Sequence, residues 1–115
     1  MSVVFRAALA ALADGEAKGF EWEGGGYGRC GFLVRRGGEV FAYHDRCPHA
    51  GNRLEWKPDA FLTKDRSLIM CSVHGANFRI RDGHCVAGPC LGKALERLTV
   101  AIEGDEVVVS LRPLR

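Results

Sequence analysis

Two short stretches carry the residue types best suited to chemistry. One reads Cys47-Pro48-His49-Ala50-Gly51 and the other reads Cys71-Ser72-Val73-His74-Gly75-Ala76. Each supplies one thiol and one imidazole, and two Cys with two His suit a soft, four-ligand metal site. Zinc fingers usually pair Cys with Cys in one half and His with His in the other, whereas both halves here are mixed. A two-iron cluster, with thiolates on one iron and imidazoles on the other, accounts for this mixing.

A structural zinc site built from the same four residues is the alternative reading. Zinc has no redox chemistry, so such a protein would be colourless and redox-silent. The colour of the purified protein separates the two readings.

The pattern Cys47-x-His49 with Gly51, followed by Cys71-x-x-His74-Gly75, resembles the Rieske [2Fe–2S] family. Further support comes from Asp45-Arg46, from Phe78, and from the stretch between Gly83 and Gly88-Pro89. The resemblance extends from about Leu12 to Val109. It implies one [2Fe–2S] cluster per chain, with Cys47, His49, Cys71 and His74 as its ligands.

The resemblance also implies an all-β Rieske fold. This is an antiparallel β-sandwich or barrel with a small cluster-binding subdomain made of two hairpin loops. The residues expected around the cluster are Gly51, Gly75, Ala76, Phe78 and Pro89. Because the imidazole edges lie near the surface in the family, a redox partner is expected to dock over Ala50 and Pro89.

The elements that must position these loops are read as strands. Phe20 and Trp22 alternate with glutamates, which indicates a half-buried strand. Gly37-Gly38, Asp82-Gly83 and Gly104-Asp105 separate apolar runs and predict hairpins. The other expected strands cover residues 3–5, 32–34, 40–43, 68–70, 77–81, 84–86, 98–102 and 107–111. Residues 56–65 should form an enlarged hairpin between the ligand loops.

Length and composition predict a single domain over residues 1–115, with the cluster-binding subdomain at about 44–90. The net charge is +2 and the basic residues are scattered, so no nucleic-acid surface is expected. Five cysteines are an odd number, which argues against a secreted disulfide scaffold. Residues 1–13 are interrupted by Arg6 and fit a strand and turn better than a signal peptide. With no membrane segment expected, a cytoplasmic location is the default.

Several reactive side chains lie outside the two motifs. His44 and His84 are read as structural or exposed, and Cys30 as a small core residue. Cys85 and Cys90 have a C-x4-C spacing. The pair is read as two reduced thiols near a third loop, which begins at Gly88-Pro89-Cys90, with a facultative disulfide as the alternative. Trp22 and Trp56 are read as packing residues.

Departures from the high-potential branch of the family predict a low reduction potential. That branch carries two cysteines that form a disulfide, at positions held here by Asn52 and Val73. It also places Ser and Tyr hydroxyls near the cluster, where this chain has Ala76 and Phe78. Fewer hydrogen bonds to sulfur stabilise the reduced state less. The potential is therefore expected nearer about −150 mV than about +300 mV.

This profile is similar to the ferredoxin component of bacterial aromatic-ring dioxygenase systems. The resemblance implies a one-electron carrier between a flavin reductase and a terminal oxygenase, without catalytic activity of its own. Two alternatives stay open. One is an accessory subunit of a reductase, similar to the small subunit of assimilatory nitrite reductase, and the other is a redox sensor.

Overall fold

The central strand of the fold is an unbroken apolar run. β3 (Cys30–Arg36) is buried from Cys30 to Val34, as is typical of a strand covered on both faces. Phe32 and Val34 belong to one hydrophobic core, whereas Leu33 between them belongs to a second core. The two cores on either side of β3 divide the molecule into two parts.

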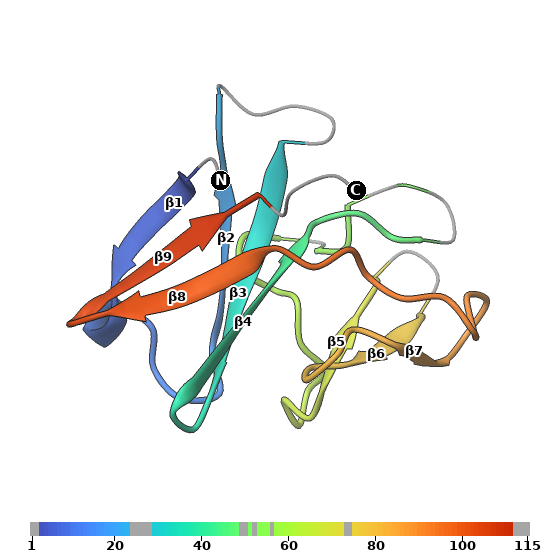
Figure 1. Ribbon diagram of the computed structural model, residues 1–115. Helices are drawn as coiled ribbons and strands as arrows, with labels where there is room; N and C mark the ends of the chain where they lie inside the picture. Colours follow the sequence, from blue (N-terminus) through green and yellow to red (C-terminus); the bar gives the residue numbers. More distant parts are fainter. Residues whose placement is uncertain are drawn as a thin grey trace.

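The computed structural model describes residues 3–23, 29–48, 51, 53–55, 57–72 and 75–111. Within them the strands form three antiparallel sheets of three strands each, in the orders β1-β9-β8, β2-β3-β4 and β5-β6-β7 (Figure 1). This arrangement confirms the expected all-β fold. Besides β3, the strands are β1 (Val3–Ala8), β2 (Ala17–Glu21), β4 (Glu39–His44), β5 (Leu68–Met70), β6 (Asn77–Arg79), β7 (Cys85–Ala87), β8 (Thr99–Glu103) and β9 (Glu106–Ser110), with a 3-10 turn at Leu9–Ala11.

We call the sheets β1-β9-β8 and β2-β3-β4 the base, and residues 45–97 the small lobe. The small lobe contains the third sheet, which lies beside β4 and away from β1 (Figure 1). The core on the base side gathers Leu12, Phe20, Trp22, Leu33, Ala42, Leu98, Val107 and Val109. In the described parts of the chain, no helix has the length and apolar character that a membrane span needs.

The predicted hairpins form at their glycine turns. β3 and β4 pair in the register Val34↔Phe41, and Gly37 adopts a positive φ of 63° in the turn between them. β8 and β9 pair across the Gly104 turn. β6 pairs with β7 but ends at Arg79, two residues earlier than the sequence predicts. The turn there begins at Ile80, which is buried against the core.

The expected enlarged hairpin is irregular and packs across the base. Leu62 bridges Ile69, and the backbone N–H of Met70 donates to the carbonyl of Phe61 at 2.8 Å. Phe61 stacks on Phe32 with ring centroids 4.3 Å apart. The carboxylate of Asp59 accepts a hydrogen bond from the backbone N–H of Gly19 in β2. These contacts fix the chain between the two ligand loops.

The small lobe leaves and rejoins the base at one place. The N–H of His44 donates to the carbonyl of Glu96, and the N–H of Leu98 donates to the carbonyl of Ala42, both at 2.9 Å. The fully buried Tyr43 donates its hydroxyl to the carbonyl of Ile80. The last residues of β4 therefore hold both ends of the small lobe.

Candidate metal centre

The two predicted thiol ligands lie in the interior of the small lobe. Cys47 and Cys71 are each 0% exposed and belong to the same hydrophobic core as Phe78 and Ala76. Cys47 follows β4 after a short bend, and Cys71 follows β5 directly. Two separate hairpins thus bring a thiol each into one apolar interior.

Both ligand loops use the same backbone turn. The carbonyl of Cys47 accepts a hydrogen bond from the N–H of Gly51 at 2.7 Å, and the carbonyl of Cys71 accepts one from Gly75 at 2.8 Å. Both glycines have positive φ, 77° and 71°, which side chains with a Cβ rarely adopt. In each motif the predicted histidine lies in sequence between the cysteine and this glycine. The shared element is therefore a Cys-x3-Gly turn.

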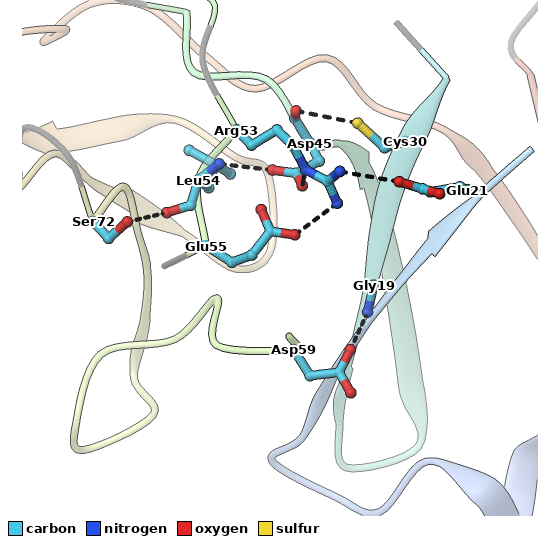
Figure 2. Close-up of polar contacts among 9 residues, drawn as sticks. All are labelled: Gly19, Glu21, Cys30, Asp45, Arg53, Leu54, Glu55, Asp59 and Ser72. Atoms are coloured by element: carbon cyan, nitrogen blue, oxygen red, sulfur yellow. Dashed lines mark hydrogen bonds and ion pairs between the residues drawn. The ribbon is translucent and has the colours of Figure 1, made fainter. Parts of the chain in front are cut away.

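Hydrogen bonds tie the second loop to the end of the first. The backbone N–H and the hydroxyl of Ser72 both donate to the carbonyl of Leu54, at 2.9 and 2.7 Å. The N–H of Leu54 in turn donates to the carboxylate of Asp45 at 2.8 Å. Figure 2 shows this chain of contacts. The two turns are thus held together by groups other than the predicted metal ligands.

Asp45 anchors the first ligand loop. Its side chain is buried, and one oxygen accepts from Nε of Arg53 at 3.1 Å. Arg53 also binds Glu21 of β2 and Glu55, which links the loop to the base (Figure 2). Burial raises the pKa of Asp45 to about 7, and Glu55 adds to the rise, against the lowering effects of the Leu54 N–H and Arg53.

The sequence reasoning cited Asp45 only in support of the family resemblance and missed its role as an anchor. An aspartate two residues before a predicted ligand cysteine, with an arginine eight residues further on, could have indicated it.

Apolar residues form the wall behind the second motif. Ala76 and Phe78 are both 0% exposed, and the carbonyl of Ala76 accepts from the N–H of Cys71 at 2.8 Å. Gly88 packs on this wall so closely that a Cβ there would lie 2.7 Å from the Cα of Ala76. Pro89, next in the chain, is exposed. The segment at Gly88-Pro89 therefore lies against the second motif.

The remaining reactive side chains separate into two groups. Cys85 and Cys90 share the core of the small lobe with Cys47 and Cys71, and their sulfurs lie 3.2 Å apart. Burial raises the pKa of Cys90 to about 12, and its contacts with Cys85 and Cys47 add to the rise. No disulfide joins any of the five cysteines, all of which lie in described segments.

The other group lies away from the centre. His44 is half-buried, packs edge-on against the buried Trp22, and has its pKa lowered mainly by burial. His84 is exposed on the hairpin return, and Cys30 is buried in the strand.

Several predicted positions fall outside the described residues. These are the ligands His49 and His74, the docking residue Ala50, and Asn52, Val73 and Trp56. Across the described ranges, no three His, Cys, Asp or Glu side chains are arranged to hold a metal ion. Of the four predicted ligands, the structure therefore places the two thiols, and the two imidazoles remain predictions from the sequence.

The residues present fit an iron–sulfur cluster. Two buried thiols suit soft metal ions, and the surrounding wall is apolar. The paired positive-φ glycines leave backbone near both cysteines without a Cβ, so N–H groups can approach sulfur there. The donor set and its burial thus suit a cluster that is shielded from water on its thiolate side.

Curated relatives carry names from dioxygenase systems. The chain is 36% identical over 78 residues to the ferredoxin component of the p-cumate 2,3-dioxygenase system of Pseudomonas putida, covering 64% of this chain and 58% of that protein. It is 28% identical over 79 residues to the 3-phenylpropionate/cinnamic acid dioxygenase ferredoxin subunit of Escherichia coli K12, covering 69% of this chain and 70% of that one. The chain thus spans less than two thirds of the Pseudomonas relative.

Solved structures share the fold over nearly the whole chain. The ferredoxin of carbazole 1,9a-dioxygenase from Nocardioides aromaticivorans IC177 superposes with a TM-score of 0.75 at 26% identity, over 97% of this chain and 100% of that one. A ferredoxin from Sphingomonas yanoikuyae B1 gives a TM-score of 0.70 at 24% identity, over 97% and 98% of the two chains. The latter likeness shows the fold alone.

The model of the Rieske [2Fe–2S] domain matches residues 4–110. It implies one [2Fe–2S] cluster per chain, in agreement with the buried thiols and the fold. Because this match extends over both the base and the small lobe, the protein belongs to the Rieske [2Fe–2S] domain family.

Proposed function

We propose that the protein is a Rieske ferredoxin that carries one electron at a time from a flavin reductase to the terminal oxygenase of a ring-hydroxylating dioxygenase system. Cys47 and Cys71 would hold one iron and His49 and His74 the other. The observation that carries the proposal is the burial of both thiols in matching Cys-x3-Gly turns of a Rieske fold. The names of the Pseudomonas and Escherichia relatives support the choice of partners.

The bound cluster would supply reversible one-electron chemistry. The protein's own part is to hold it without rearrangement. Asp45 and Ser72 fix the two loops through Leu54, and the wall of Ala76 and Phe78 keeps water from the thiolates. An electron carrier benefits from such a rigid site, because few groups must move when the charge changes.

A low potential is part of this proposal. Ala76 and Phe78 are fully buried beside the second motif and have no hydroxyl to donate to sulfur. The reduced cluster would therefore lose the stabilisation that such donors give. We place the potential toward the low end of the Rieske range, near about −150 mV.

The docking surface is assigned to the exposed residues around the two motifs. Pro89 and Gly75 are exposed there, and Gly51 is partly exposed. With Ala50 they would form a rim of small or apolar residues around the imidazoles. Leu91, 65% exposed two residues after Pro89, extends the apolar surface. A small apolar contact fits a partner that must leave after each turnover.

We also assign the chain to one domain and to the cytoplasm. The strand β3 contributes side chains to both cores, which supports a single cooperative unit. Five cysteines without a disulfide suit a reducing compartment.

Metal analysis of purified protein is the first test. We expect a red-brown protein with two irons and two sulfides per chain and, after reduction, the low-average-g EPR signal of a mixed His/Cys cluster. A colourless protein with stoichiometric zinc would overturn the proposal. Co-purification in a stable complex with a reductase would favour the accessory-subunit alternative, and no transfer to any oxygenase would favour a sensor.

The docking assignment has its own test. Pro89→Glu places a bulky charge on the rim, so stopped-flow electron transfer to the oxygenase should slow several-fold, while the potential stays unchanged. Ile102→Glu is the matched control, because Ile102 is 43% exposed on β8, near the turn at the opposite end of the molecule from β5–β7 (Figure 1). Equal rates for the two variants would place the docking surface elsewhere.

A further inference from the structure

Two cysteines that are not assigned to the cluster lie in contact with each other. The thiol of Cys90 donates to the sulfur of Cys85 across 3.2 Å. They are five positions apart in sequence, and both belong to the core of the small lobe. Cys30 offers a contrast, because its thiol contacts the carbonyl of Asp45 at 3.8 Å and is placed in the core on the strand β3. Cys90 also contacts Cys47, so the thiol pair borders the assigned metal centre.

The backbone holds the two cysteines face to face. The N–H of Cys85 donates to the carbonyl of Lys93, and the N–H of Lys93 donates to the carbonyl of Cys90, both at 2.9 Å. Gly88 turns the chain between them with a φ of 99°. In a disulfide the sulfurs are about 2.05 Å apart, so bond formation needs an approach of only about 1 Å from the observed contact.

We propose that Cys85 and Cys90 form a redox-active dithiol, which a small peroxide converts reversibly into an intrachain disulfide while the cluster stays bound. Cys85 is 6% exposed and Cys90 1%, so hydrogen peroxide meets Cys85 first. The Cys85 sulfur takes one oxygen and becomes a sulfenic acid, and one water leaves. The Cys90 thiol then attacks the Cys85 sulfur, the S–O bond breaks, the thiol proton leaves with the hydroxyl as a second water, and the S–S bond forms.

The two steps balance. Two S–H bonds and the O–O bond break, one S–S bond and two waters form, and the two electrons lost by the thiols reduce the peroxide. A dithiol reductant such as dithiothreitol returns both thiols by exchange. The low exposure of both sulfurs and the raised pKa of Cys90 make the reaction slow, so it responds to sustained rather than brief peroxide exposure.

The position of the pair gives the disulfide a consequence for the metal centre. Gly88 and Pro89 lie between the two cysteines in sequence, and Gly88 packs on Ala76 of the second motif. A bond between Cys85 and Cys90 would close this covering loop onto β7. We infer that the oxidised form releases its cluster more slowly, because the loop opens less often.

Mass spectrometry of the holoprotein tests the proposal directly. The protein is treated with hydrogen peroxide, quenched with catalase, denatured with a chelator, alkylated and digested with trypsin. Cleavage after Arg81 and Lys93 yields residues 82–93 with both cysteines in one peptide. We expect this peptide unalkylated and two hydrogens lighter, and doubly alkylated again after dithiothreitol. A peptide that stays doubly alkylated while the cluster absorbance begins to fall would overturn the proposal.

Variants identify the partner and separate this proposal from the function above. In Cys85→Ser, Cys90 should remain alkylatable after peroxide, whereas Cys30→Ser should still form the light peptide. A cross-link between Cys90 and Cys47 in the wild type would overturn the assignment. The oxidised wild type should lose its visible absorbance to a chelator at least twofold more slowly than the reduced form, and equal rates would overturn the inferred effect on the loop. Electron transfer to an oxygenase does not enter this readout.

Discussion

The base and the small lobe reach similar burial by different means. The strands of the base have five to seven residues each, whereas β5, β6 and β7 have three residues each. Yet Phe61, Ile69 and Phe78 in the small lobe are as fully buried as Phe32 in the base. Long hairpins organise one part of the molecule. Loops organise the other, and a metal centre is assigned to those loops.

This difference indicates that the small lobe needs a source of stability other than its strands. A three-residue strand contributes few ladder hydrogen bonds, and sheets that small are marginal in isolation. Four of the five cysteines lie in the small lobe, and two of them are the assigned thiol ligands. Binding of a metal by such loops is coupled to their folding. We therefore expect the small lobe to depend on the cluster much more than the base does.

Removing a thiol ligand should have the largest effect. Cys47→Ser or Cys71→Ser should abolish the visible absorbance and the bound iron, and amide hydrogen exchange in residues 68–87 should lose most of its protection. β3 and β9 should keep more of their protection, because Leu33, Val107 and Val109 pack in a core that contains neither assigned thiol ligand. His49→Ala and His74→Ala should behave alike. Cys30→Ser and His84→Ala are the controls, and bleaching of either would contradict the ligand assignment.

Matched cavities in the two cores come next. Leu33→Ala in the base core and Ile69→Ala on β5 should each lower the apparent free energy of unfolding by about 3 kcal/mol, because both side chains are almost fully buried. Only Ile69→Ala should also speed the loss of the cluster to a chelator. Urea unfolding and the decay of visible absorbance measure the two effects. Equal rates of cluster loss would mean that cluster retention depends equally on the base and on the small lobe.

The covering loop gives a smaller, more local effect. Gly88→Ala combines a strained φ of 99° with a Cβ 2.7 Å from the Cα of Ala76, and should cost about 2 kcal/mol of stability. Gly92→Ala has a similar φ of 88° but no atom within 4 Å of the new Cβ, so it should cost about 1 kcal/mol. Thermal unfolding compares the pair. Identical losses of stability in the two variants would show that the backbone at Ala76 moves away from the new Cβ at no energetic cost.

Hydroxyl donors added beside the second motif should raise the potential. Ala76→Ser and Phe78→Tyr each offer one donor toward the cluster. A hydrogen bond that is stronger by about 1 kcal/mol in the reduced state corresponds to about +40 mV for a one-electron couple. Protein-film voltammetry measures the shift, with Phe41→Tyr on β4 as the matched change. A wild-type potential well above zero would contradict the argument from missing donors.

Much of the base could be predicted from local pattern. The apolar run from Phe32 to Val34 indicated a strand, and Gly37-Gly38 indicated its hairpin, because apolar runs and turns depend on neighbouring residues. The extension of this strand to Cys30 and its burial on both faces were not predicted. In the small lobe the motifs located the two thiols but not their supports. Both motifs place a glycine four residues after the cysteine, but a shared turn was not predicted from this spacing.

The contacts that hold the site could not be predicted in this way. Asp59 binds the N–H of Gly19 across 40 positions, and Ser72 binds Leu54 across 18. Such pairings depend on how the loops fold over the base, for which one sequence has no periodic signal. The contact between Cys85 and Cys90 likewise depends on the φ of Gly88 and on the closure at Lys93.

The two ends of the small lobe join the base at the same place, which has a consequence for recombination. Both ends of residues 45–97 meet at the end of β4, through the pairs His44–Glu96 and Ala42–Leu98. In topology, the small lobe is an insertion into the base between β4 and β8, and its two junctions lie side by side. Exchange of this lobe between members of the family would need to match these junctions and the faces of Phe32 and Tyr43 that it covers. The redox properties could then be exchanged together with the small lobe, independently of the base.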